Sequence, residues 1–341
     1  MIFMSNYLIL IIIFFIIILI TVISSKYLKL FDISDNKRKI HTEPALFTGG
    51  IGIFVCALAS LKIENYDIFI SKLIAFSVIL CITGLLDDLK KINIGSKLAL
   101  QMFTLLLIIV DGLEIKSLGL FSFGEVKLGF FAVPFTLGCM ILLINAVNYI
   151  DGVDGLASTI FINSFILLIF YNSKILINDM LLSHLALCLI VFLLFNFKLF
   201  KFVPKCFLGN SGSLLLGYFL GFMLIYYSQT KNLISPLLVI WAISFVVFEF
   251  ISVNFSRFLR NTPLTKPGND HIHFYILFKT KSKFKTLFLI NFINFALGII
   301  GYYNLKYFGP EMNIFTYIIF FSIYFFLREK ISINNQSNNN F

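Results

Sequence analysis

Residues 145–158 read NAVNYIDGVDGLAS, a stretch with two asparagines, two aspartates and two glycines. The residues before it, FTLGCMILLI, and those after it, TIFINSFILLIF, contain no charged side chain. Because a helix needs about 20 apolar residues to cross a bilayer, this pattern predicts two membrane-spanning helices that meet at a polar membrane boundary. The two carboxylates are then placed at a membrane surface.

The whole chain has the composition of a membrane protein. Of its 341 residues, 59% are hydrophobic and 13% are charged, whereas a soluble domain carries about 25% charged residues. We therefore predict an all-α polytopic membrane protein, with one integral-membrane domain over residues 1–330 and a disordered, Asn-rich tail over residues 331–341. About eleven transmembrane helices are expected, at residues 7–25, 46–62, 68–86, 97–111, 130–148, 154–171, 181–199, 212–228, 233–255, 284–304 and 312–328.

The basic residues are distributed unequally between the two predicted faces of the membrane. Twenty of the 27 Lys and Arg residues fall in the loops after odd-numbered spans or in the tail. The positive-inside rule makes that face cytoplasmic and places the N-terminus outside. The net charge of +10 then favours membrane lipids with anionic headgroups and anionic substrates, so it requires no nucleic acid as a partner.

One segment on the outer face differs from its surroundings. Residues 113–129 read LEIKSLGLFSFGEVKLG, with three glycines and partial alternation of apolar and polar residues. This pattern predicts a short β-hairpin.

Five polar clusters fall on the predicted cytoplasmic face, and none falls on the other face. Solvated loops with no common role would not sort by side in this way, so the clusters predict one site at the inner membrane surface. They are SDNKRKIHTEPALFTGG at 34–50, Asp87-Asp88, residues 145–154, FLGNSGS at 207–213 and KPGNDHIHF at 266–274.

In the opening stretch, asparagine or aspartate recurs every third residue, which places these side chains along one stripe of a helix. Carboxylate and amide oxygens are ligands that Mg²⁺ prefers, usually together with substrate phosphates. A turn at the two Asp-Gly pairs is the alternative, but it does not explain the preceding asparagines. The residues are Asn145, Asn148, Asp151 and Asp154.

The other clusters also allow two interpretations. The FLGNSGS segment opens a span, and helix N-terminal amides favour phosphate; a tight interhelical turn is the alternative. His271 and His273, beside Asp270 in a loop with arginines, suit a diphosphate, unless the loop is only solvated. The pair Asp87-Asp88 is either part of the site or a solvated helix end next to two lysines.

Taken in order, these motifs resemble the polyprenyl-phosphate N-acetylhexosamine-1-phosphate transferases of glycosyltransferase family 4, which are related to phospho-N-acetylmuramoyl-pentapeptide transferase. The combination of NxxNxxDGxDGLA with an upstream DD and a downstream HxH is the specific part. The resemblance implies a multi-pass protein of the bacterial inner membrane with a cytoplasmic active site. The motifs are DNKRKIHTEP with GG, GLLDDLKKINIGSKLALQ, NAVNYIDGVDGLA, FLGNSGS and DHIHF.

The resemblance implies transfer of N-acetylhexosamine-1-phosphate, most often GlcNAc-1-phosphate, from UDP-N-acetylhexosamine to undecaprenyl phosphate, releasing UMP. This reaction initiates lipid-linked cell-envelope polysaccharides such as O-antigen. Since two anions must meet, most of the catalytic work is charge neutralisation and alignment. A catalytically impaired lipid-binding member of the family and a transporter of lipid-linked sugar are the alternatives, and homodimer formation is left open.

Individual roles follow from the resemblance. Asn148 and Asn210 are expected to hold Mg²⁺, or Mn²⁺ in its place, with Asp151 or Asp154 nearby. Asp87 or Asp88 is expected to deprotonate or orient the lipid phosphate. The expected substrate-binding residues are Lys97 on phosphate, Phe207 on uracil, Arg260, His271 and His273 on the leaving UMP, and Asn145 and Asp270.

The chain departs from the family pattern in two places. The family usually has an aspartate magnesium ligand where this chain has Asn210, whose amide offers a carbonyl oxygen without the charge. The family loop motif usually ends HxHH, but its last position here is Phe274. The aspartate usually three residues before the first histidine is Gly268 here, and Asp270 is expected to replace it.

The charge pattern makes a topology prediction that cysteine labelling can test. A cysteine replacing Lys90 should react with a membrane-impermeant thiol reagent only from the cytoplasmic side, and one replacing Ser122 only from outside. The chain without an added cysteine measures the background labelling. Reversed labelling would overturn the predicted orientation.

Overall fold

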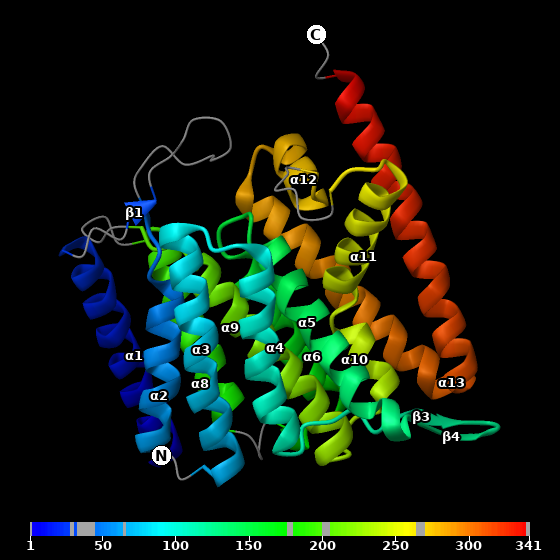
Figure 1. The fold of residues 1–341 in the computed structure, drawn as a ribbon, viewed down its shortest axis with the longest axis horizontal. Coiled ribbons are helices and arrows are strands. Elements are labelled where there is room, and N and C mark those ends of the chain that lie inside the picture. The colour runs from blue at the N-terminus through cyan, green and yellow to red at the C-terminus, as the bar shows by residue number, and fades with distance from the viewer. Residues whose placement is uncertain are drawn as a thin grey trace. The chain divides into compact units, whose positions relative to one another are not determined.

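A computed structural model describes residues 2–27, 31–32, 45–63, 66–175, 180–199, 205–263 and 270–338 (Figure 1). The DNKRKIHTEP motif and Gly268 lie outside these residues. The chain forms two compact units. The first contains residues 1–113, 137–162 and 176–221, and the second contains residues 114–136, 163–175 and 222–341.

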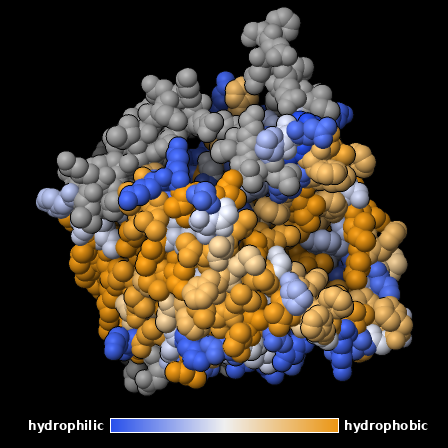
Figure 2. Space-filling view, in the orientation of Figure 1, coloured by the Kyte–Doolittle hydropathy of each residue, from blue (hydrophilic) through white to orange (hydrophobic). Residues whose placement is uncertain are grey.

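The first unit consists of apolar helices packed side by side. In it, α2 (Gly49–Ile63) packs against α1 (Ile2–Tyr27), α3 (Ile68–Lys90) and α8 (Met180–Asn196), and α3 packs against α4 (Ile94–Val110). Figure 2 shows hydrophobic side chains along the flanks of these helices, as expected for surfaces that face lipid. Completing the unit are parts of α5 (Ala132–Ile150), α6 (Leu156–Tyr171) and α9 (Gly209–Ile225), and the antiparallel pair β1 (Phe31–Asp32) and β2 (Ala45–Leu46).

Glycines allow the start of α9 to approach α2 and α3 closely. A Cβ atom on Gly84 in α3 would lie 2.2 Å from the backbone nitrogen of Ser211, and one on Gly50 would lie 2.2 Å from the backbone nitrogen of Gly212. The amide of Gly50 also donates a 3.0 Å hydrogen bond to the carbonyl of Leu208. Small residues at helix interfaces are a common way for membrane helices to bring their backbones together.

The second unit contains the β-hairpin that the sequence predicts at 113–129. Strands β3 (Ser117–Phe121) and β4 (Gly124–Lys127) pair antiparallel, which confirms that prediction. Gln229 anchors the hairpin, since its side chain accepts a hydrogen bond from the amide of Ser117 and donates one to the carbonyl of the same residue. The other elements are η1 (Gly129–Phe131), η2 (Tyr226–Thr230), α10 (Pro236–Ala242), α11 (Ser244–Leu259), α12 (Ile272–Thr280) and α13 (Lys283–Asn338).

The helices confirm an α-helical, membrane-embedded protein, and every predicted span overlaps a helix. By length and composition, four helices in the described part of the chain can cross a membrane, or five if a bent pair counts as one span. Five further apolar helices are shorter. The total of eleven crossings and their orientation therefore stay predictions.

The range 233–255, predicted as one span, is broken. Helices α10 and α11 meet at an angle of 74°, with Ile243 in a non-helical conformation between them. The break leaves the carbonyl of Ala242 outside the helical ladder, and it accepts hydrogen bonds of 3.0 Å from Ser164 and from Asn294. Membrane helices tolerate such breaks where neighbouring side chains satisfy the exposed backbone groups.

Helix α13 covers both of the last two predicted spans. Gly309 has a φ of 83° and interrupts the helix just before Pro310, which has no amide hydrogen to donate. The part of α13 after Gly309, its second arm, continues to Asn338, into the segment that the sequence analysis expects to be disordered. A helix that has already formed extends more readily than a new one begins, so the Asn-rich residues follow the apolar arm.

The close approach of α3 and α9 gives a stability prediction. The Gly84→Ala variant should lower the free energy of unfolding in detergent by about 1–3 kcal/mol, because the new methyl group meets backbone rather than a flexible side chain. Gly138→Ala is the matched control, since a Cβ there meets nothing within 4 Å. Equal melting temperatures for the two variants would contradict this packing.

Candidate functional site

The carboxylate of Asp88 lies at the start of α9. The backbone amide of Asn210 donates to Asp88 Oδ2 at 3.0 Å, and the Asn210 side-chain nitrogen donates to Asp88 Oδ1 at 2.8 Å. Gly209 begins α9 with a φ of 71°, and a Cβ on it would lie 2.8 Å from Asp88 Oδ2. Glycine at this position therefore lets a carboxylate approach the positive end of a helix.

Asn148 extends this contact to a third helix. Its side-chain nitrogen donates to Asn210 Oδ1 and to the hydroxyl of Ser213, both at 2.7 Å. One hydrogen-bonded chain thus joins Asp88 from α3, Asn210 from α9 and Asn148 from α5. The structure brings together the two predicted metal-binding residues and one aspartate of the DD pair.

Two half-buried lysines pair with Asp87 and Asp154. Lys97 lies 2.8 Å from Asp87, and Lys205 lies 2.7 Å from Asp154. The Lys205 ammonium also lies 4.5 Å from the ring centre of Phe207. Sequence reasoning missed Lys205, although its position two residues before the FLGNSGS segment was a usable signal. Both cations are placed where an anionic ligand can replace their carboxylate partners.

Asp151 lies in the turn between α5 and α6 and is half-buried. Burial raises the pKa of its carboxyl well above the usual value, and the nearby charges of Asp88 and Asp154 raise it further. A concentration of negative charge of this kind favours binding of a cation. Asn145, on the same stripe, instead donates hydrogen bonds to Gln101 and to the carbonyl of Ile141, so its NH₂ group holds α5 against α4.

The remaining predicted residues belong to the second unit. His271 precedes α12, and its ring stacks on that of His273 at 5.3 Å between centroids. Asp270 receives two hydrogen bonds, of 2.7 and 2.9 Å, from the guanidinium of Arg257. Although burial raises the pKa of Asp270, these bonds and the charge of Arg257 outweigh it and lower the pKa below its usual value. Asp270 therefore acts within an ion pair, and Arg260 is likewise paired, with Glu329 at 2.6 Å.

His273 does not fit its expected role as a cation. The side chain is fully buried, and neither ring nitrogen has a hydrogen-bond partner within the described residues. Burial lowers its pKa to about 3, with a further contribution from His271. The imidazole is therefore neutral at pH 7, and it is suited to hydrogen bonding rather than to charge neutralisation.

The donor set fits a hard cation. The described residues contain no group of three or more His, Cys, Asp or Glu side chains arranged to hold a metal ion. Asp88, Asn148 and Asn210 nevertheless offer carboxylate and amide oxygens at one place, and Mg²⁺ commonly takes few protein ligands and completes its shell with water and phosphate.

Fold and site together define a membrane-embedded helical protein with carboxylate, amide and lysine side chains suited to phosphate chemistry. Residues 70–228 match the family described as "Glycosyl transferase family 4". This segment contains the DD pair, the NxxNxxDGxDGLA stretch and FLGNSGS, so the match agrees with the resemblance that these motifs suggest.

Curated relatives cover most of the chain. A protein of Bacillus subtilis (strain 168), named "Probable undecaprenyl-phosphate N-acetylglucosaminyl 1-phosphate transferase", is 27% identical over 84% of this chain and 82% of its own length. Two further relatives are named "Undecaprenyl-phosphate alpha-N-acetylglucosaminyl 1-phosphate transferase". The protein of Escherichia coli (strain K12) is 26% identical over 86% of this chain and 81% of its own length. The protein of Yersinia pestis is 28% identical over 78% of this chain and 75% of its own length.

The contact between Asp88 and Asn210 predicts how a cation affects stability. Asn210→Asp replaces a donor to Asp88 with a second carboxylate. Without divalent cations the melting temperature should therefore fall, and the free energy of unfolding should decrease by about 1–3 kcal/mol. Mg²⁺ should then raise the melting temperature more than it does in the wild type, because a bound cation stabilises the folded state.

Asn210→Ala is the comparison variant, since it loses the side-chain hydrogen bonds to Asp88 and Asn148 without adding a charge, and Mg²⁺ should stabilise it less than the wild type. If Mg²⁺ affects all three proteins equally, no cation binds at this cluster.

Proposed function

We propose that the protein transfers GlcNAc-1-phosphate from UDP-GlcNAc to undecaprenyl phosphate and releases UMP, at the cytoplasmic face of the bacterial inner membrane. The observation that carries this proposal is the Asp88–Asn210–Asn148 cluster, with the lysine–aspartate pairs that accompany it. GlcNAc as the sugar follows the names of the relatives. The cytoplasmic location follows the distribution of basic residues.

The reaction joins two anions at a membrane surface. An oxygen of the lipid phosphate attacks the phosphorus atom that carries the sugar, a new P–O bond forms, and the bond to the bridging oxygen breaks. The bridging oxygen leaves with UMP. Because the second pKa of a phosphate monoester is about 6, the lipid phosphate is already largely dianionic at pH 7 and needs no strong base.

The two lysines provide charge for this step. In the structure Lys97 and Lys205 are neutralised by Asp87 and Asp154. A phosphate that enters the site competes with these carboxylates for the ammonium groups, and the aspartates become available to orient the acceptor. Alignment and charge compensation account for most of the acceleration of phosphoryl transfer.

Asp88, Asn148 and Asn210 are the residues that would hold Mg²⁺, or Mn²⁺ in its place. When bound, the cation supplies positive charge to the diphosphate of the nucleotide sugar. The hydrogen bonds among the three side chains fix their oxygens near one another before any ligand enters.

The test is an assay with purified protein, radiolabelled UDP-GlcNAc, undecaprenyl phosphate and Mg²⁺. The wild type should form labelled lipid, and Asp87→Asn and Asp88→Asn should each lower turnover at least tenfold. Asp67→Asn is the matched control, because Asp67 caps the opposite end of α3 and asparagine is an equally good cap.

Labelled lipid bound without turnover would favour a non-catalytic member of the family, and movement of lipid-linked sugar across vesicles without synthesis would favour a transporter. Full turnover in either aspartate variant would remove that residue from the site.

A further inference from the structure

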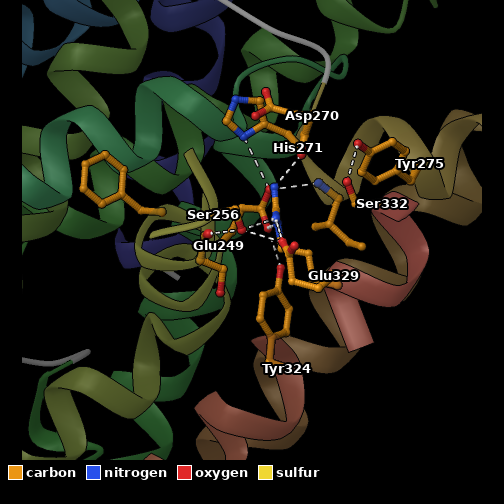
Figure 3. Close-up of polar contacts among 12 residues, drawn as sticks. Glu249, Ser256, Asp270, His271, Tyr275, Tyr324, Glu329 and Ser332 are labelled. Carbon is orange, nitrogen blue, oxygen red and sulfur yellow. Dashed lines mark hydrogen bonds and ion pairs between the residues drawn. The ribbon is translucent and has the colours of Figure 1, made fainter. Parts of the chain in front are cut away.

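The second arm of α13 inserts a charged side chain into the protein. Arg328 lies near the C-terminal end of this 56-residue helix, and its side chain is only 2% exposed. Figure 3 shows its neighbours Tyr324 and Glu329 beside Glu249 and Ser256 of α11, with Asp270 and His271 close to this group. Neither the sequence motifs nor the proposed reaction assigns a role to Arg328 or Glu249.

The guanidinium of Arg328 connects three segments of the chain. One terminal nitrogen donates a 2.6 Å hydrogen bond to the backbone carbonyl of Asp270. The other donates to the hydroxyl of Ser256 at 3.0 Å and to Glu329 at 2.7 Å. Its Nε atom lies 3.4 Å from Glu249 Oε2. Because the guanidinium group is planar and rigid, these contacts fix its orientation.

Glu249 meets the same segment from the other side. Its Oε1 atom accepts a 2.8 Å hydrogen bond from the backbone amide of Ile272 and lies 3.4 Å from His271 Nδ1. Its Oε2 atom accepts a 2.7 Å hydrogen bond from the hydroxyl of Tyr324. Arg328 thus holds the carbonyl of residue 270 and Glu249 holds the amide of residue 272, with His271 fixed between them.

The Arg328–Glu249 pair is better suited to positioning the backbone around His271 than to stabilising the folded protein. Relative to apolar residues of the same volume, a buried ion pair adds little net stability, because both ions lose their hydration. The pair does fix the direction of the hydrogen bonds that it makes. Here those bonds go to the backbone on either side of His271, within the HIH motif.

We propose that Arg328 and Glu249 are positioning residues that hold the His271–His273 segment in the conformation that binds the nucleotide of the sugar donor. This inference rests on the proposed function. It makes the C-terminal arm of α13 part of the active enzyme, although none of its residues touches substrate in this account.

Hydrogen exchange measured without substrate tests the positioning itself. In Arg328→Met and Arg328→Lys, the amides of residues 270–274 should exchange at least tenfold faster than in the wild type, while the β3–β4 hairpin keeps its protection. Lys330→Met is the matched control, because it removes an exposed cation two residues further along the same helix. Unchanged protection of residues 270–274 in both Arg328 variants would overturn the proposal.

Steady-state kinetics test the link to the reaction. Arg328→Met should raise the KM for UDP-GlcNAc at least tenfold and leave the KM for undecaprenyl phosphate within about twofold of the wild type. Arg328→Lys, which keeps the charge opposite Glu249, should recover part of the loss. A fall in kcat with both KM values unchanged indicates only a smaller folded fraction and would overturn the positioning role.

A further variant covers the case in which Arg328→Met does not fold. Arg328→Met combined with Glu249→Gln removes both charges together, so that Glu249 is no longer a buried carboxylate without its cation. It should show the same rise in KM for UDP-GlcNAc, and a normal KM would contradict the proposal. If the wild type itself makes no labelled lipid, the proposed function fails while the exchange experiment still decides whether Arg328 holds the segment.

Discussion

The close approach of α3 to the first turn of α9 is the constraint on which the cluster of Asp88, Asn210 and Asn148 depends. Gly84 allows backbone contact at a position where any side chain would meet the amide of Ser211. One turn further along α3, this contact brings the carboxylate of Asp88 within 3.0 Å of the amide of Asn210. The backbone contact therefore comes first, and the hydrogen bonds of Asn210 and Asn148 follow from it.

Two of the aspartates in this unit, Asp87 and Asp154, are paired with lysines before any ligand binds. Asp88 is instead satisfied by three hydrogen bonds from Asn210. Because Lys97 and Lys205 are paired, neither is an uncompensated charge before a ligand enters, and each presents its positive charge when a phosphate displaces its carboxylate. This property suits an enzyme that must bind two anions in turn.

Sequence patterns predicted the local features well and the long-range contacts poorly. Periodicity and turn residues predicted the helices and the hairpin, because each of these patterns lies within one short segment of the sequence. The bend at Ile243 was not predicted, because it depends on Ser164 and Asn294, which are remote in sequence and satisfy the freed carbonyl. Arg328 is the last residue of the span predicted at 312–328, and nothing near it in sequence indicates that it is buried.

Asn210 is the residue where local pattern and structure are most usefully combined. From the sequence alone, Asn210 differs from the aspartate usual at this position by lacking a negative charge, so it is expected to be a weaker metal ligand. In the structure its NH₂ group donates to Asp88, a contact that an aspartate would turn into repulsion between two carboxylates. The amide thus stabilises the site without a cation and still offers a carbonyl oxygen to one. A cluster built in this way keeps its shape without a metal, and in the proposed reaction the phosphates of the substrates would supply more of the negative charge that a cation requires.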